Sequence, residues 1–112
     1  MSMCNGQYTE KPWGGEWLIE TNDKYSFKKL LVKKGEMCSL QYHKKKKETI
    51  FVLQGEMKIW INGIKEILKE DESITINPNV IHRMEGITDC WYLEASTSEL
   101  DDVVRLEDKY GR

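Results

Sequence analysis

The sequence is short of net charge and of long apolar runs, and each shortage excludes a class of protein. Its formal net charge of −2 gives no overall attraction to nucleic acid or to a membrane surface. No apolar run approaches the roughly 20 residues of a membrane-spanning helix, and the first residues lack the charged and apolar regions of a secretory signal. We therefore expect a cytoplasmic protein that binds neither nucleic acid nor membrane.

Cysteine is also scarce. Cys4, Cys38 and Cys90 lie far apart in the chain and form no CxxC pair. An odd number of unpaired cysteines predicts free thiols in a reducing compartment. Because Cys38 and Cys90 lie within β-rich runs, we expect both to be small buried hydrophobic residues rather than catalytic thiols.

Helical periodicity is almost absent, and the 112 residues suffice for one domain. Short β-rich runs alternate with turns, and Asn62-Gly63 within KIWINGIKEIL is a strong hairpin signal. Only residues 97–109 could form a turn or a short helix. This pattern predicts an all-β fold, a small antiparallel sandwich or barrel. Residues 1–10 lack periodicity and are expected to form a flexible arm ahead of a single domain over residues 11–112.

The most informative stretch runs from Gly35 to Gly55. Gln41 and His43 are two residues apart in SLQYH, so their side chains leave the same face of an extended strand. Glu48 opens the next β-rich run, and His82 follows the turn NPNV.

Gln, His, Glu and His together suit one borderline divalent ion, zinc before manganese, iron, cobalt or nickel. The alternative is a pair of histidines that bind nothing. A buried Glu48 would be costly without a cation, which favours the metal.

The spacing of this stretch resembles the first cupin motif, with Gln41 in place of the motif's first histidine. His82 and the preceding turn resemble the second motif. KPWG at 11–14, VKKGEMCSLQYH at 32–43 and DDVVRLEDKYGR at 101–112 are similar to the phosphomannose isomerases. Nearly the whole chain resembles the C-terminal cupin of bifunctional mannose-1-phosphate guanylyltransferase/mannose-6-phosphate isomerases. The resemblance implies a small antiparallel cupin (jelly-roll) barrel.

The same resemblance implies a metal-dependent isomerase that interconverts mannose 6-phosphate and fructose 6-phosphate. The alternative is a non-catalytic metallo-cupin that binds a sugar or sugar phosphate. An iron-dependent cupin oxygenase is less expected, because such sites generally use more than the two histidines present here. The sequence has no glycine-rich nucleotide loop, so GDP-mannose synthesis is not expected.

Three further residues take expected roles from the resemblance. Arg105 matches an arginine that the family places near the substrate, and a catalytic and phosphate-binding role is expected; an ion pair with nearby acids is the alternative. Lys46 aligns with a substrate-contacting arginine of the family. Its run, Lys44 to Lys47, is either simply solvated or a positive collar for phosphate at the mouth of the site. Glu94 aligns with an inward-facing family glutamate and is a candidate general base, with a lysine or a metal-bound hydroxide as alternatives.

Two expectations concern neighbouring features. Arg83 directly follows His82, so strand alternation should point it away from the metal. Strands that carry tryptophan often pair through their edges in small cupins, so a homodimer is expected by analogy.

Overall fold

The computed structural model of the chain describes residues 6–110, which fold into strands, turns and loops. Eleven strands follow one another: β1 (Gln7–Lys11), β2 (Gly14–Thr21), β3 (Ser26–Val32), β4 (Leu40–Tyr42), β5 (Glu48–Gln54), β6 (Met57–Ile61), β7 (Ile64–Leu68), β8 (Ser73–Ile76), β9 (His82–Gly86), β10 (Cys90–Ser96) and β11 (Val104–Glu107). Within this described part of the chain there is no helix, and hence none that could cross a membrane.

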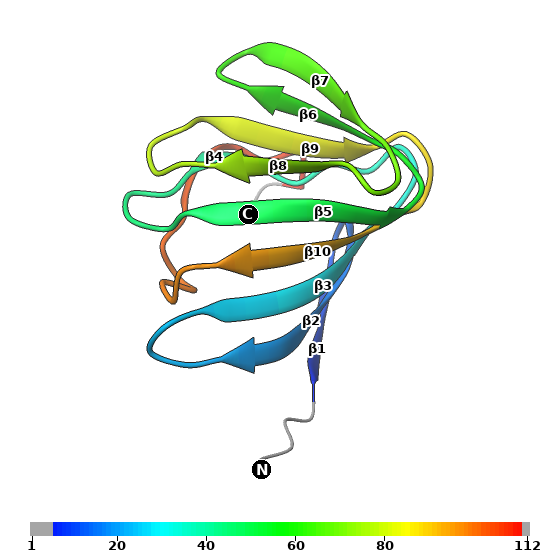
Figure 1. Cartoon of the computed structure of the whole chain (residues 1–112). Helices are drawn as coiled ribbons and strands as arrows, with labels where there is room; N and C mark the ends of the chain where they lie inside the picture. Colours follow the sequence, from blue (N-terminus) through cyan, green and yellow to red (C-terminus); the bar gives the residue numbers. More distant parts are fainter. Residues whose placement is uncertain (1–5, 111–112) are drawn as a thin grey trace.

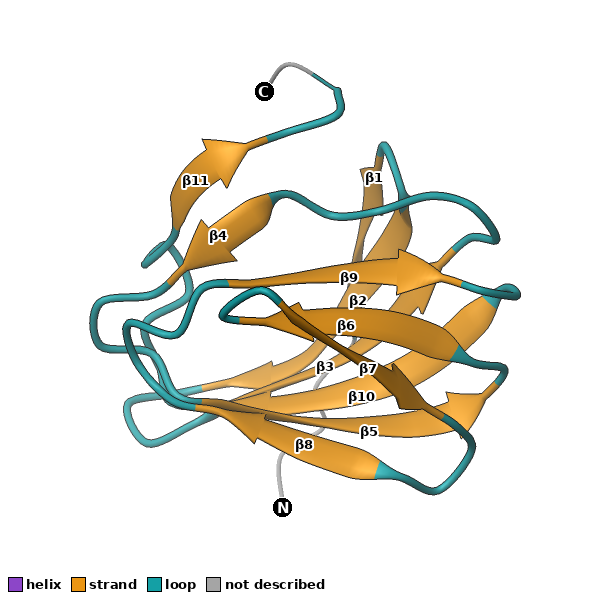
Figure 2. Ribbon diagram, turned by 90° about the horizontal axis from the view of Figure 1, so that it is seen from above, coloured by secondary structure: helices purple, strands orange, loops and turns teal. Residues whose placement is uncertain are grey.

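The strands form two antiparallel sheets that lie against each other (Figures 1 and 2). One sheet has six strands in the order β1-β2-β3-β10-β5-β8, and the other has five in the order β11-β4-β9-β6-β7. The expected all-β antiparallel fold is therefore confirmed. Because neighbours in both sheets come from distant parts of the sequence, the ends of β4, β5 and β9 can meet at one place.

The alternation of side chains in β5 shows why the strands pack as they do. Ile50 and Val52 are fully buried between the sheets, whereas Phe51 and Leu53 point to the opposite face and stay partly exposed. The same period of two fills the rest of the core. Its other members include Leu30, Val32, Met57, Ile59, Ile76, Met84 and Tyr92. Glu48 shares the inward face of β5 with Ile50 and Val52, so a carboxylate is buried at one end of the core.

The hairpin predicted at Asn62-Gly63 joins β6 to β7. Both residues have positive φ, 48° and 83°, as a tight two-residue turn requires. Asn62 also binds the turn that precedes β9: its backbone N–H donates to the Ile81 carbonyl, and its side-chain oxygen accepts from the Ile81 N–H.

The structure differs from two sequence expectations. Residues 7–10 do not form a loose arm, because they belong to β1, which pairs residue by residue with β2 and stacks the ring of Tyr8 on Trp17. Residues 1–5 of that arm lie outside the described part of the chain. Within residues 97–109, Leu100 and Asp101 form a turn, as one of the two expectations had it. Residues 104–107 form the edge strand β11 rather than a short helix, because the backbone of β4 offers them partners at Tyr42 and Gln41.

Candidate metal centre and cavity

Three strands bring His43, Glu48 and His82 together at one end of the core. His43 follows the last residue of β4, Glu48 is the first residue of β5, and His82 is the first residue of β9. Glu48 Oε1 lies 3.5 Å from His43 Nε2 and 3.3 Å from His82 Nε2. All three side chains are buried, and their ligand atoms lie within 4.8 Å of one another.

The hydrogen bonds of the two imidazoles decide which nitrogen faces the centre. His43 Nδ1 lies 2.6 Å from the Asp102 carbonyl oxygen, and His82 Nδ1 lies 2.9 Å from the Val80 carbonyl oxygen. A carbonyl oxygen only accepts, so Nδ1 of each ring donates a proton. In the neutral ring, Nε2 therefore carries a lone pair directed at Glu48.

With both imidazoles neutral, three acceptor atoms therefore face one another without donors. His43 Nε2, Glu48 Oε1 and His82 Nε2 are buried and have no hydrogen-bond partner within the described chain. Such an arrangement is costly unless a cation occupies the centre. Two imidazole nitrogens and one carboxylate oxygen, each imidazole fixed by a second hydrogen bond, fit a divalent metal ion. The group could therefore hold a metal.

Gln41 lies beside this group. It pairs in register with His82 across β4 and β9, and it lines the same cavity as His43. Its amide oxygen accepts a hydrogen bond from the Ser39 hydroxyl at 2.6 Å. One lone pair of that oxygen remains, so its role as a fourth ligand stays a prediction.

Lys46 enters the site instead of standing at its rim. Lys44, Lys45 and Lys47 are exposed, but Lys46 is 6% exposed. Its ammonium lies 3.2 Å from Glu48 Oε2 and 3.3 Å from Glu94 Oε2. Burial works against this charge, but the Glu94 and Glu48 carboxylates outweigh it and raise the pKa of Lys46. The lysine is therefore an internal counter-charge between two buried acids.

The two acids respond in opposite directions to this environment. Burial tends to raise the pKa of Glu48, but the imidazoles of His43 and His82 and the charge of Lys46 hold it well below its usual range. Burial, followed by the charge of Glu48, raises the pKa of Glu94 to about 7. Burial also tends to lower the pKa of His43, but its contact with Glu48 raises it overall. Glu48 is the permanent anion of the site, and Glu94 is the carboxyl group suited to proton exchange near neutrality.

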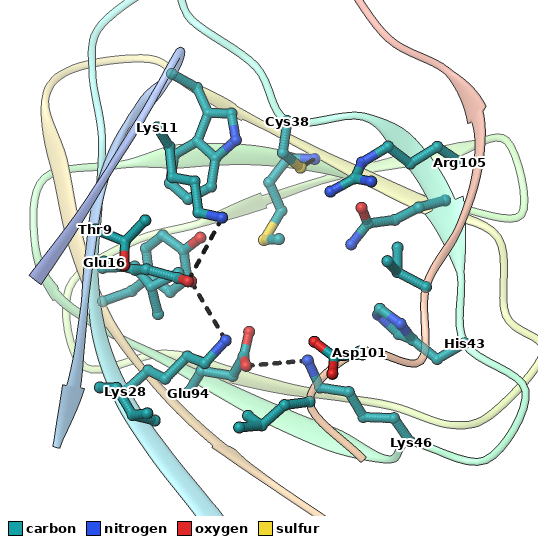
Figure 3. Close-up of a pocket in the computed structure, with 18 of the residues that line it drawn as sticks. Thr9, Lys11, Glu16, Lys28, Cys38, His43, Lys46, Glu94, Asp101 and Arg105 are labelled. Atoms are coloured by element: carbon teal, nitrogen blue, oxygen red, sulfur yellow. Dashed lines mark hydrogen bonds and ion pairs between the residues drawn. The ribbon is translucent and has the colours of Figure 1, made fainter. Parts of the chain in front are cut away.

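A cavity of about 500 Å³ opens beside this group, between the β1–β3 end of one sheet and the β4–β11 edge of the other. Arg105, His43, Lys46 and Glu94 all line it (Figure 3). Within residues 6–110 no hydrogen bond or ion pair engages the guanidinium of Arg105. Of the acids that were the alternative to a ligand, Asp101, Asp102 and Glu107 form no ion pair with it in that part of the chain.

The opposite wall of the cavity carries charges that the sequence analysis did not single out. Glu16 lies between Lys11 and Lys28, with ion pairs of 3.6 Å and 3.3 Å (Figure 3). Glu16 and Lys28 alternate with outward-facing residues of β2 and β3. The period of two therefore predicts that they share a face with every second residue of their strands. That period alone does not tell which face of the sheet is the inner one.

Asp102 is another residue whose role in the site the sequence did not predict. Its carboxylate accepts hydrogen bonds from the backbone N–H groups of Lys44, Lys45 and Lys46 at 2.7–3.0 Å. These bonds lower the pKa of Asp102 to about 2. The same residue's carbonyl holds His43. Asp102 therefore sets both the lysine turn and one candidate ligand from more than fifty residues away, and no local pattern could reveal this.

The cysteines and Arg83 do not belong to the group of three candidate metal ligands. Cys38 and Cys90 are buried free thiols, and burial raises their pKa values to about 11 and about 12, as expected for inert hydrophobic residues. Cys4 lies outside the described residues. Arg83 points away from the centre and donates to the carbonyls of Cys38 and Glu107.

A family profile described as mannose-6-phosphate isomerase C-terminal matches residues 3–108. Mannose-1-phosphate guanylyltransferase ManC of Salmonella typhimurium is 37% identical over 107 residues, which cover 91% of this chain and 22% of the relative. Xanthan biosynthesis protein XanB of Xanthomonas campestris is 31% identical over 107 residues, with 91% and 23% covered. The chain thus spans about a fifth of the length of these relatives.

Solved structures show the same fold at lower identity. KdgF from Halomonas sp. superposes with a TM-score of 0.81 at 12% identity and covers 90% of this chain and 96% of that one. The capsular polysaccharide assembling protein CapF from Staphylococcus aureus also gives 0.81, at 20% identity, with 92% and 32% covered. An RmlC-like cupin from Shewanella frigidimarina gives 0.75 at 15% identity, with 86% of each chain covered. These likenesses establish the cupin fold.

Proposed function

The chain belongs to the mannose-6-phosphate isomerase C-terminal family of cupins, and on this basis we propose that it is a metal-dependent isomerase of mannose 6-phosphate and fructose 6-phosphate. One observation carries the proposal. The buried acceptors of His43, Glu48 and His82 lie next to a cavity that also contains a carboxyl group and a guanidinium with no partner among residues 6–110. These are the groups that an aldose–ketose isomerase of a phosphorylated sugar needs.

The proton transfer of this reaction is assigned to Glu94. A proton leaves C2 of the aldose and is returned to C1, while a hydroxyl proton moves from the C2 oxygen to the C1 oxygen. A carboxyl group with a pKa of about 7 can both accept and release a proton near neutral pH. A divalent ion held by His43, Glu48 and His82, with Gln41 as fourth ligand, would polarise the two sugar oxygens.

Phosphate binding is assigned to Arg105 and Lys46. The guanidinium of Arg105 lines the cavity and can donate two parallel hydrogen bonds to a phosphate group. Lys46 directs its ammonium at Glu48 and Glu94, and an ammonium has three donors, so one remains for the ligand.

Charge balance supports an anionic ligand. The basic side chains of the site are matched by the acidic ones: Lys11, Lys28, Lys46 and Arg105 against Glu16, Glu48, Glu94 and Asp101. A divalent cation would leave two positive charges in excess, and a phosphate monoester carries about −1.5 to −2 at neutral pH.

A second candidate is a metallo-cupin that binds the sugar phosphate without converting it. The position of Lys46 favours this alternative, because its ammonium already neutralises Glu94, the proposed base. The two functions predict the same metal and the same ligand, and they differ only in turnover.

The test is to load the protein with zinc or manganese, measure the bound metal, and couple mannose 6-phosphate conversion to detection of fructose 6-phosphate. We expect His82→Ala to lose both metal and turnover, and Glu94→Gln to keep the metal but lose turnover. Arg105→Ala should mainly raise KM. Glu85→Gln is the matched control: this residue lies on the outer face of β9, in the five-stranded sheet, and the variant should behave as wild type.

Mannose 6-phosphate binding by calorimetry, with no turnover in the metal-loaded wild type, would replace the isomerase by the binding module. A wild-type protein that retains no metal would remove the basis of both.

A further inference from the structure

In part of the six-stranded sheet, charged side chains lie on the inner face and aromatic side chains on the outer face. Glu16 of β2, Lys28 of β3 and Glu94 of β10 point inward to the cavity. Their neighbours along the strands point outward to the opposite face. A sheet that is solvated on one side normally places apolar residues inside and polar residues outside. Here β2, β3 and β10 reverse that arrangement at the cavity end of the sheet.

The outer face of this sheet is rich in aromatic and aliphatic side chains. Trp17 stacks on Tyr8 with ring centroids 4.6 Å apart and on Trp91 with centroids 5.4 Å apart. The apolar side chains of this face are Tyr8, Trp17, Phe27, Leu31, Phe51, Leu53, Trp91 and Leu93. Tyr8 is 51% exposed and Leu53 40%. We refer to these eight residues as the aromatic face.

The aromatic face is ordered by close packing. The ring of Tyr8 lies over Gly15, where an added Cβ atom would come within 2.7 Å of the ring. Lys29 places its ammonium over Trp91 at 4.9 Å and over Trp17 at 6.0 Å. These contacts restrict the rings of Tyr8, Trp17 and Trp91 before any partner binds, which lowers the cost of association.

The outer face of the five-stranded sheet differs. Lys58 and Glu85 form an ion pair there, Arg83 lies opposite Trp60, and Lys65 flanks the same tryptophan. This face mixes these charges with an apolar hollow lined by Met37, Leu40, Trp60 and Ile81. Within residues 6–110, the other sheet packs only on the inner side of the six-stranded sheet, so no described element covers the aromatic face.

We propose that the aromatic face is the interface through which two copies of this chain associate, sheet against sheet. Strands about 4.8 Å apart that rise about 3.3 Å per residue give a six-stranded face roughly 600 Å² of projected area. The accessible area of a side-chain-covered face is larger than its projection. It is therefore of the same order as the approximately 800 Å² that each partner buries in a standard interface.

The charges of the aromatic face favour a second copy as the occupant. Lys29 is its basic side chain among the described strand residues, and Glu10 and Glu20 lie at its border. A two-fold axis repeats every contact in both directions, so a face with one base inside an acidic border can complement itself. This interface joins faces, whereas the sequence analysis expected pairing of edges. It does not depend on the proposed activity.

The first test uses the wild-type protein. Sedimentation velocity between 1 and 200 μM should show a concentration-dependent dimer. Oxidative footprinting at the two ends of that range should show slower labelling of Trp17 and Trp91 at high concentration, with Trp60 unchanged. A monomer at 200 μM, or equal labelling of all three at both concentrations, would overturn the proposal.

The second test uses matched variants. Trp91→Glu should raise the dimer dissociation constant at least about thirtyfold, the loss typical of a central aromatic anchor. Trp60→Glu makes the same change on the outer face of the other sheet and should leave the dimer intact. Lys29→Glu, which keeps all the apolar side chains, is the milder second variant and should also weaken the dimer. A dimer that resists both changes on the aromatic face but dissociates in Trp60→Glu would place the interface on the other sheet.

Discussion

The two faces of the six-stranded sheet are built from the same strands but have opposite chemistry. In β10, Glu94 is 5% exposed and reaches the cavity, while its neighbour Leu93 lies on the outer aromatic face. A sheet that only had to fold would place these side chains the other way round. The reversal is consistent with the two proposals made above, a small polar ligand on the inside and a second copy of the chain on the outside.

The charged inner face is compatible with a stable fold because its positive and negative side chains are paired. Lys46 lies between two buried acids, and Glu16 lies between two lysines. A buried charge without a partner would cost several kcal/mol, whereas a closed set of opposite charges loses much less. Removing a single charged side chain from this set should therefore leave its partners unpaired and destabilise the inner face.

Glu48→Gln should have the largest effect, on metal binding. It removes a carboxylate that faces both histidines. Loss of a direct ligand should weaken zinc affinity by more than the roughly 10–100-fold that loss of an outer-shell partner costs. Competition with a chromophoric chelator measures the affinity. Glu85→Gln is the control, and equal affinities in the two variants would contradict the assignment of Glu48.

Lys46→Met should come next, as a loss of stability in the metal-free protein. It leaves Glu48 and Glu94 as adjacent buried acids, and breaking a buried ion pair costs about 3–5 kcal/mol. Zinc replaces the missing positive charge, so the variant should gain more stability from zinc than the wild type does. Urea unfolding with and without zinc measures both quantities. A variant as stable as the wild type without metal would show that the lysine is not a counter-charge.

The adjacent residues Ile50 and Phe51 allow the inner and outer faces to be compared by substitutions that remove no charge. Ile50 is fully buried between the sheets, so Ile50→Ala should cost about 2–5 kcal/mol of unfolding free energy. Phe51→Ala changes the aromatic face, so its cost should be smaller at low protein concentration and should grow as the concentration rises. Denaturation of both variants at 1 and 100 μM measures this difference. Equal costs that do not change with concentration would contradict the distinction between the faces.

The smallest effect is expected outside both faces, at Glu36. Tyr110 donates a hydrogen bond to its carboxylate, and this bond, with the charge of Lys109, lowers the pKa of Glu36. A lowered folded-state pKa contributes stability above the ordinary pKa of the carboxyl, and that contribution is lost as the pH falls through the folded-state value.

Tyr110→Phe should therefore be less stable than the wild type at pH 7, and the difference should shrink as the pH approaches 3. Urea midpoints across that range test the sign. A difference that is constant with pH would show that lost packing, rather than the hydrogen bond, explains the variant.

Much of the site follows from local patterns in the sequence. The two-residue spacing of Gln41 and His43, the β-rich run that Glu48 opens and the hairpin at Asn62-Gly63 predicted the strands. The resemblance to cupins predicted that His43, Glu48 and His82 converge. Lys46 and Glu48 are also two residues apart, so their shared inward direction was present in the sequence. It was masked by the exposed lysines on either side.

The remaining features depend on contacts that local patterns do not contain. The edge strands β1 and β11 are polar, and backbone pairing with β2 and β4 fixes them rather than their own preferences. In β10, Trp91 and Leu93 alternate with Cys90 and Tyr92, so hydrophobicity fits either face equally well. Only the position of the second sheet decides which set is inside.

Asp102 has a consequence for the order in which the protein is made. His43 depends on the carbonyl of a residue 59 positions later in the chain, and the lysine turn depends on the same residue's carboxylate. During synthesis, both sheets can begin to pair before that residue exists, but the two imidazoles cannot be fixed together. A nascent chain should therefore bind the proposed metal only after the segment that carries Asp102 has docked beside His43, so metal capture should follow the first pairing of the sheets.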